Sequence, residues 1–253
     1  FWQVFRCAAP ALMAGNVVLL KHAPNTQGCA EAIADLFKDV GFENHELQVL
    51  RADESRVADV INDRRVRGTA LTGSVAAGSA VGAEAGRAIK PSVLELGGSD
   101  PFIVLEDADL DRAVEIGVQA RMQNNGQSCI AAKRFILHRS IAKDFTRKFV
   151  DAVEDLTVGN PMDDMTDIGP MAREDLRDIV HDQVERAISD GAVAEAGGHT
   201  VDRRGFFYRP TVLTEVERGT VAFEEEIFGP VASLIVAEDV GEAVDLANDS
   251  RFG

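Results

Sequence analysis

The stretch that decides the fold is residues 92–98, Ser-Val-Leu-Glu-Leu-Gly-Gly, in which an apolar run meets an acidic residue and then two glycines. The run Val-Leu-Glu-Leu is strand-like, and a glycine pair is a strong local breaker. We therefore expect a first domain over residues 1–97 and a second domain over residues 98–253. Glu95 lies at the end of the predicted strand.

Strand-like and helix-like segments alternate at short range before this point. This alternation favours an α/β fold with a parallel sheet. The predicted strands cover residues 17–21, 47–51, 69–72 and 92–96, and the predicted helices cover residues 28–40, 54–63 and about 75–89.

The second domain shows the same alternation with longer helices. A polar, glycine-rich stretch at 197–205 predicts a loop, and residues 225–230 predict a turn. The predicted strands cover residues 102–105, 133–138, 210–213 and 232–236, and the predicted helices cover residues 110–122, 141–154, 173–189 and a segment from about 241.

Cys129 follows a small-residue turn, residues 124–128, so its thiol is expected to be both reachable and positioned. Glu95 is expected to lie among apolar neighbours at a strand end, an environment that suits a general base. A thiol and a carboxyl are the minimum for covalent acyl chemistry, because one forms the intermediate and the other activates water to release it. Taken singly, an isolated cysteine is more often a small buried apolar residue, and a strand-end glutamate is more often solvated.

Composition limits the class of protein. The chain has 253 residues, of which 45% are hydrophobic, enough for a packed core, and a net charge of −16. This charge disfavours nucleic acid and anionic membranes as partners. Cys7, Cys29 and Cys129 are dispersed and suggest neither a disulfide framework nor a metal site, so we expect a reducing, cytoplasmic setting. No run of 18 apolar residues predicts a membrane span.

Glu95 in its E-L-G-G context and Cys129 in its G-Q-x-C context lie 34 residues apart in the sequence. They resemble the two signature motifs of the aldehyde dehydrogenase superfamily, and the resemblance covers essentially the whole chain. It implies a partial Rossmann-like cofactor domain followed by an α/β catalytic domain of the aldehyde dehydrogenase fold. It also implies that Cys129 attacks an aldehyde, that hydride passes to a nicotinamide, and that Glu95 activates the water that releases the acid.

Several cofactor-binding residues follow from the same resemblance. Gly73 and Ser74 lie where a strand ends and a helix begins, a place that favours anions; residues 72–74 match the T-G-S turn of the superfamily. Glu226 and Phe228 match the E-x-F-G-P motif, which implies contacts to the nicotinamide ribose and to the nicotinamide. Leu96 is assigned to the cofactor site as the neighbour of Glu95.

The nucleotide itself is expected to be NAD or NADP. Lys21, at a predicted strand end, matches a lysine that contacts the adenosine ribose. Strictly NAD-dependent relatives carry a glutamate three residues later, where this chain has Pro24. Pro24 would not repel a 2′-phosphate, and Lys21 and His22 could assist one.

The chain is similar to the succinate-semialdehyde dehydrogenase branch, which implies a small-molecule aldehyde with a distal carboxylate. Arg6 aligns with an arginine that holds this carboxylate, and a guanidinium fork suits that role; the alternative is a surface ion pair. A second arginine of the branch falls at Gln123 here, and Arg121 is a nearby residue that could compensate or not.

Both ends of the chain read as truncated. The P-W-N motif that supplies an oxyanion-binding asparagine would lie just before Phe1, and the segment implied for homo-oligomer formation would lie beyond residue 253. Three alternatives stay open: an aldehyde dehydrogenase of other substrate range, a thioester hydrolase that uses only Cys129 and Glu95, and a non-catalytic fragment that binds a partner.

Overall fold

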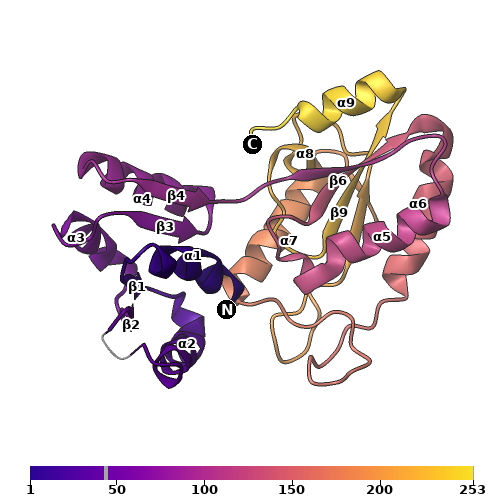
Figure 1. Cartoon of the computed structure of the whole chain (residues 1–253). Helices are drawn as coiled ribbons and strands as arrows, with labels where there is room; N and C mark the ends of the chain where they lie inside the picture. Colours follow the sequence, from indigo (N-terminus) through magenta and orange to yellow (C-terminus); the bar gives the residue numbers. More distant parts are fainter. Residues whose placement is uncertain (43–44, 253) are drawn as a thin grey trace. The chain divides into compact units, whose positions relative to one another are not determined.

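The computed structural model describes residues 1–42 and 45–252, and the chain divides into two compact units between Leu96 and Gly97 (Figure 1). The division lies one residue ahead of the boundary that the glycine pair indicates. Each unit is built from alternating strands and helices, as the sequence predicts.

The first unit contains short strands joined by helices. Its strands pair in parallel as β1 with β2 and β3 with β4, with Thr72 opposite Glu95. The four strands form two separate pairs and not the continuous sheet that the alternation suggests. They are only three or four residues long, and the buried hydrophobic cluster of this unit lies around the first pair. The elements of the unit are α1 (Trp2–Met13), β1 (Val18–Leu20), η1 (Pro24–Thr26), α2 (Gln27–Asp39), β2 (Leu47–Val49), η2 (Glu54–Arg56), α3 (Val57–Asn62), β3 (Thr69–Thr72), α4 (Val75–Arg87) and β4 (Ser92–Glu95).

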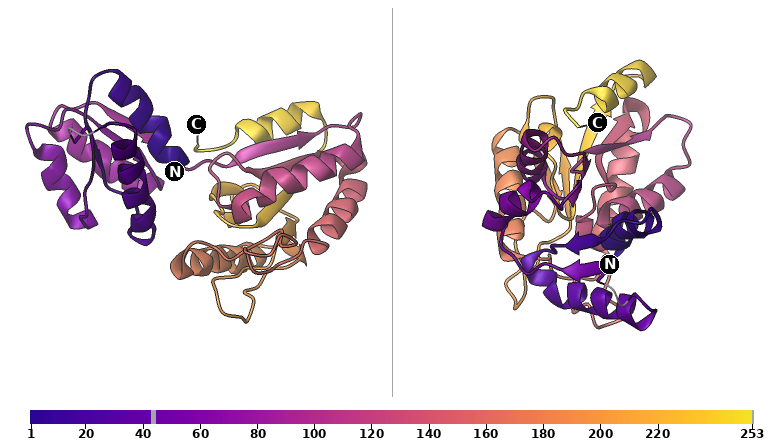
Figure 2. Two further views of the ribbon diagram at one scale, coloured as in Figure 1. Left: turned by 60° about the horizontal axis from the view of Figure 1, so that its bottom comes forward. Right: turned by 60° about the vertical axis from the view of Figure 1, so that its left-hand side comes forward.

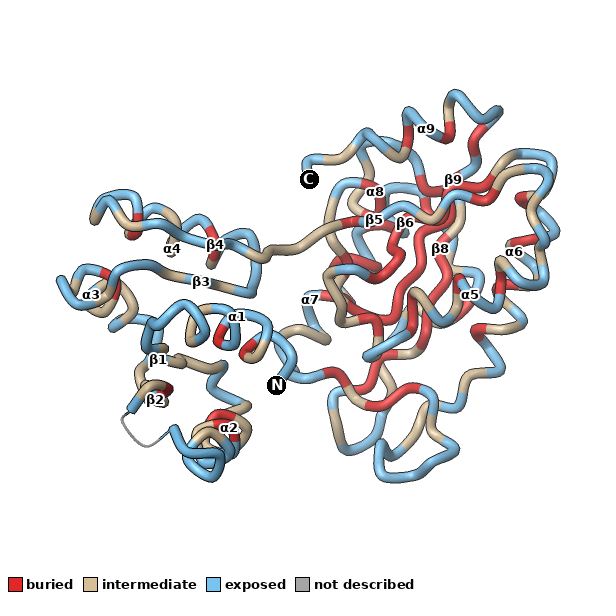
Figure 3. The backbone as a smooth tube through the Cα atoms, in the orientation of Figure 1, coloured by how far each residue is buried: buried red, intermediate tan, exposed pale blue. Residues whose placement is uncertain are grey.

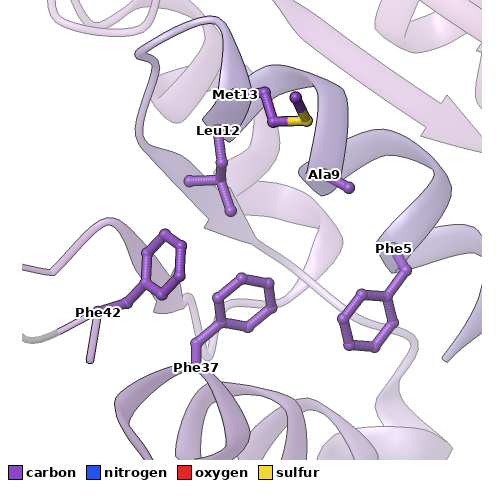
Figure 4. Close-up of a pocket in the computed structure, with 6 residues that line it drawn as sticks. All are labelled: Phe5, Ala9, Leu12, Met13, Phe37 and Phe42. Atoms are coloured by element: carbon purple, nitrogen blue, oxygen red, sulfur yellow. The ribbon is translucent and has the colours of Figure 1, made fainter. Parts of the chain in front are cut away.

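Helices α1 and α2 form an open apolar hollow between them (Figure 4). Its volume is about 310 Å³, and the Phe5 and Phe37 rings stack across it with centroids 5.7 Å apart. Its lining residues are Phe5, Ala9, Leu12, Met13, Phe37 and Phe42. Because no lining side chain carries a polar group other than the Met13 thioether, the hollow offers no acid, base or nucleophile.

The second unit is organised by a five-stranded sheet in the order β5-β6-β9-β8-β7. All neighbouring strands run parallel except β7 and β8, which are antiparallel. The sequence did not predict β7, a four-residue edge strand with small side chains. The strands are β5 (Asp100–Val104), β6 (Ala132–His138), β7 (Val193–Ala196), β8 (Thr211–Thr214) and β9 (Val231–Ala237).

Helices cover both faces of this sheet, because successive side chains of a strand point to opposite faces. On β6, Phe135 and Leu137 join the core beneath α5 and α6, whereas Ile136 joins the core beneath α7, α8 and α9. Figure 2 gives two further views of these helices, and Figure 3 shows the buried residues concentrated on the sheet. The helices are α5 (Leu110–Met122), α6 (Arg139–Glu154), α7 (Glu174–Ser189), α8 (Val221–Glu224) and α9 (Val240–Asn248). Helix α8 is a single turn that the sequence did not predict.

No helix in the described part of the chain combines the length and apolar character needed to cross a bilayer.

Replacing Phe149 by alanine should lower the free energy of unfolding of the second unit by about 3–5 kcal/mol. Phe149 on α6 is fully buried, with its ring centroid 4.9 Å from that of Phe135 and 5.4 Å from that of Phe145. Denaturant unfolding of wild type and variant measures the difference. The matched control is Ile116→Ala on α5, where the side chain is 41% exposed and the loss should be much smaller; equal losses would mean that the aromatic cluster does not hold α6 on the sheet.

Candidate active site

Three consecutive residues before Cys129 adopt the left-handed backbone conformation. The φ angles of Asn124, Asn125 and Gly126 are 54°, 55° and 70°. Asparagine and glycine are the residues that tolerate this conformation best. The sequence Asn-Asn-Gly therefore permits the sharp turn that leads from α5 to the loop carrying Cys129, whose side chain is partly exposed as predicted.

The side chains of the turn hold neighbouring loops. The Asn125 amide accepts a hydrogen bond from Gly169 N (2.9 Å) and donates one to Pro170 O (3.0 Å). The Gln127 side-chain oxygen accepts from Ala172 N (3.0 Å). Asn125 is thus committed to the scaffold.

Arg121 ties the Cys129 turn to the turn that contains Glu226. Its side chain is completely buried, and its guanidinium donates hydrogen bonds to Gly126 O (2.8 Å), Ile227 O (3.2 Å) and Gly229 O. A fourth bond reaches Ala132 O at 3.2 Å. These carbonyls belong to segments about 100 residues apart in sequence, so one cation fixes their relative positions.

The possibility that Arg121 replaces the substrate-binding arginine missing at Gln123 is therefore wrong. Its guanidinium is buried and used by main-chain carbonyls. Burial lowers the pKa of Arg121 to about 10, against the opposing effect of nearby Glu226, so the group is charged at neutral pH.

Lys133 is a second buried cation at the Cys129 turn, and the sequence analysis did not single it out. Its ammonium donates to Ser128 O (3.0 Å), Cys129 O (2.8 Å) and Ala131 O (3.3 Å). The available signal was a Lys-Arg pair, residues 133–134, at the start of a strand that otherwise reads as apolar. These three hydrogen bonds hold the loop of the candidate nucleophile against the buried ammonium of Lys133.

Glu226 lies in the same unit, close to these groups. Its Oε1 is 3.4 Å from Lys133 Nζ, yet this buried oxygen has no hydrogen-bond partner among the described residues. The carboxylate also lies so close to Gly97 that a Cβ at that position would collide with Oε2. A side chain at position 97 would therefore force the Glu226 carboxylate to move. An orphan carboxylate oxygen fits a hydroxyl donor such as a ribose.

The turn after β3 presents the first candidate phosphate site. Gly73 N donates to Glu95 O (3.0 Å), and Ser74 Oγ accepts from Ala77 N (3.2 Å) as the N-cap of α4. Because the oxygen acts as the acceptor in this bond, the Ser74 hydroxyl hydrogen is still available for a phosphate oxygen. Leu96 packs its side chain against Gly78 of α4, where a Cβ would collide with it.

Glu95 and Arg6 form an ion pair, with Nη2 and Oε1 2.8 Å apart. The side chains are 43% and 53% exposed, respectively. The expectation that Glu95 lies among apolar neighbours is therefore wrong, because the residues adjacent to Glu95 in the sequence do not surround its carboxylate. The surface ion pair considered for Arg6 is present, and its partner is the candidate base itself.

Lys21 follows β1 and Pro24 opens η1, and both reach the surface. His22 Nδ1 accepts from Ala23 N (3.0 Å), while Nε2 is buried without a partner in the described ranges. Burial is the main cause that lowers the pKa of His22, with positive charges nearby adding to it, so the ring is neutral at pH 7. His22 accordingly brings no positive charge to a 2′-phosphate at that pH.

The alternating strands and helices of the two units match the fold of solved aldehyde dehydrogenases, of which the chain covers about half. The chain belongs to the aldehyde dehydrogenase family, whose model matches residues 1–253.

Its relatives include named enzymes. It is 52% identical over 252 residues to the succinate semialdehyde dehydrogenase [NAD(P)+] Sad of Escherichia coli, across 100% of this chain and 54% of that protein. It is 53% identical to the succinate-semialdehyde dehydrogenase [NADP(+)] 1 of Mycobacterium tuberculosis, across 100% of this chain and 55% of that protein. The chain thus spans about half the length of the curated relatives it matches.

Solved structures agree. The succinic semialdehyde dehydrogenase of Streptococcus pyogenes, determined with NADP+ as the cofactor, superposes with a TM-score of 0.97 at 34% identity. The match covers 100% of this chain and 56% of that one.

Gly126→Ala should destabilise the second unit and displace Cys129. The variant combines an unfavourable positive φ with a Cβ that would collide with Gly229 O. Gly191→Ala is the matched control, since Gly191 also has positive φ but nothing within 4 Å of an added Cβ. The control should lose about 1 kcal/mol and Gly126→Ala at least twice that in denaturant unfolding. Similar losses at both sites would show that the close approach of the two turns carries no cost.

Proposed function

We propose that the protein oxidises an aldehyde to a carboxylic acid, with NAD or NADP as the acceptor, through a thioester on Cys129. The observation that carries the proposal is the arrangement in the second unit. There, two buried cations, Arg121 and Lys133, tie the Cys129 turn to the turn of Glu226. The turn of the nucleophile and the turn of a carboxylate suited to a cofactor ribose are thereby held by one scaffold.

In this proposal Cys129 attacks the carbonyl carbon to form a thiohemiacetal, which loses hydride to leave a thioester. No acceptor is hydrogen-bonded to the main-chain N–H of Cys129 in the described part of the chain, so it is available to the developing oxyanion. A bound nicotinamide supplies the hydride acceptor. Glu95 takes a proton from the water that attacks the thioester, and the acid leaves as Cys129 regains its thiol.

The residues present fit a dinucleotide. The Ser74 hydroxyl and the N-terminus of α4 suit a phosphate, and the orphan oxygen of Glu226 suits a ribose hydroxyl. We assign Lys21 to the second ribose, and Phe228 and Leu96 to the surroundings of the nicotinamide. Two domain roles follow: cofactor binding for residues 1–97 and catalysis for residues 98–253.

Pro24 supports NADP as well as NAD, because no carboxylate stands at that position to repel a 2′-phosphate. The Mycobacterium tuberculosis relative is named for NADP(+), and the Escherichia coli relative for NAD(P)+. Neutral His22 leaves Lys21 as the nearby charge for that phosphate.

The substrate we propose is succinate semialdehyde. We propose that the whole protein acts on it as a cytoplasmic homo-oligomer. The relatives named above support it, and Arg6 offers a guanidinium of suitable shape for the distal carboxylate. Since Arg6 is paired with Glu95, a substrate carboxylate would compete with Glu95 for the guanidinium and release the base.

Cys129→Ala should abolish aldehyde-dependent formation of reduced nucleotide and leave nucleotide affinity nearly intact. The alanine removes the sulfur that forms the thioester, whereas the proposed contacts to the nucleotide come from other residues. Absorbance of the reduced cofactor, with a panel of aldehydes and both nucleotides, measures the first property, and titration calorimetry measures the second. Cys7→Ala and Cys29→Ala are controls that should stay active. Wild-type thioester hydrolysis with no nucleotide binding would instead identify a hydrolase.

Arg6→Ala should raise KM for succinate semialdehyde and change kcat/KM for butanal much less, because only the semialdehyde has a distal carboxylate. Losing one partner of a buried charge pair costs about 2–5 kcal/mol, and less where water reaches it. The readout is the ratio of kcat/KM values for the two aldehydes in wild type and variant. If both values fell by the same factor, Arg6 would act only as the partner of Glu95, and a general aldehyde dehydrogenase would be the better description.

A further inference from the structure

Lys133 is a buried titratable residue to which the proposed chemistry gives no role. Lys133 is 3% exposed, and its ammonium donates hydrogen bonds to the carbonyls of Ser128, Cys129 and Ala131. Hydrogen bonds from an ammonium to carbonyls offset part of the cost of removing a charge from water. The cation therefore shapes the loop on both sides of the candidate nucleophile.

Lys133 also faces the carboxylate of Glu226. Glu226 Oε1 is 3.4 Å from its Nζ, and this buried oxygen has no hydrogen-bond partner among the described residues. Asp100 also favours the charged form of Lys133, whereas Arg121 opposes it. Burial is the largest effect and lowers the pKa of Lys133. The ammonium thus contacts both the Glu226 carboxylate and the carbonyl of Cys129.

Burial strengthens the interactions of the ammonium with the Glu226 carboxylate and with the Cys129 carbonyl. Coulomb interactions are much stronger in a site shielded from water than at an exposed one. The side chain of Lys133 is 4% exposed and that of Glu226 is 17% exposed. A change in the charge or hydrogen bonding of Glu226 should therefore be felt at the Cys129 turn through Lys133.

We propose that Lys133 is a positioning residue that couples Glu226 to Cys129, so that the state of the cofactor-binding carboxylate sets the reactivity of the thiol. The coupling rests on the proposed function in assigning Glu226 to a ribose. Hydroxyl donors on Glu226 would draw its negative charge away from Lys133 and leave more of the positive charge for the nucleophile turn. Binding of the nucleotide would in this way prepare Cys129 for attack.

The test is a double-mutant cycle read out by alkylation of Cys129 with iodoacetamide, without aldehyde or nucleotide. Peptide mass spectrometry follows Cys129 and uses exposed Cys7 as the internal reference. Glu226→Gln removes the carboxylate charge and should speed alkylation of Cys129 about three- to tenfold, because a positive charge near a thiol favours its reactive anion. Lys133→Met should slow it by about tenfold.

The decisive result is the double variant. If Lys133 carries the coupling, Glu226→Gln should have no further effect in the Lys133→Met background. An equal effect of Glu226→Gln in both backgrounds, or none in either, would overturn the proposal, since a lysine that merely supports the fold would not change the response to Glu226. Lys143→Met, at an exposed position on α6, is the matched control and should behave as wild type.

Lys133→Gln guards against loss of folding in Lys133→Met. Glutamine can donate to the carbonyls of the loop but carries no charge. The cycle in this background should again abolish the response to Glu226→Gln, and a retained response would overturn the proposal. Nucleotide binding and aldehyde oxidation are measured separately, so failure of the proposed function would leave the alkylation result interpretable.

Discussion

The second unit depends on the hydrogen bonds from one buried guanidinium to the carbonyls of two distant turns. Arg121 contacts Gly126 O in the Cys129 turn and Ile227 O and Gly229 O in the Glu226 turn. Charge-assisted bonds of this kind are stronger than neutral ones. Their loss would leave buried carbonyls unsatisfied, at about 1–3 kcal/mol each. Both turns carry residues of the proposed site, so the hydrogen bonds of Arg121 stabilise the second unit and also fix the geometry of that site.

Two neighbouring cations on β6, Lys133 and Arg134, also donate hydrogen bonds to main-chain carbonyls. Lys133 holds the carbonyls around Cys129, and Arg134 donates to Ser99 O (3.0 Å) and to Leu246 O (2.8 Å) and Ala247 O (2.9 Å) of α9. A cation at the end of a helix also interacts favourably with the helix dipole. Main-chain carbonyls accept hydrogen bonds from all three cations, and the Glu226 carboxylate, 3.4 Å from Lys133 Nζ, keeps one buried oxygen without a hydrogen-bond partner among the described residues.

The first unit uses a different constraint, the parallel pairing of β3 and β4. Their register places Thr72 beside Glu95, so the Gly73-Ser74 turn and the candidate base reach the same edge. This edge is where parallel sheets bind ligands. The exposed pair of Arg6 and Glu95 completes the edge, and as a surface ion pair it contributes about 0–1 kcal/mol, weak enough for a substrate carboxylate to exchange with Glu95.

The sequence by itself determined most of the order of elements, the family and the candidate nucleophile, because these follow from local periodicity, turn residues and short motifs. It predicted α5 to the residue, and it identified residues 124–128 as a turn. Only the tertiary structure decided that the first four strands form two pairs, that Glu95 meets Arg6, and that Arg121 and Lys133 clamp the loops of the site. The physical reason is that strand pairing, the Glu95–Arg6 ion pair and the bonds of the buried cations to main-chain carbonyls depend on which segments meet in the fold. The Arg121 bonds join residues up to 108 apart, and no local motif distinguishes the carbonyls that accept them.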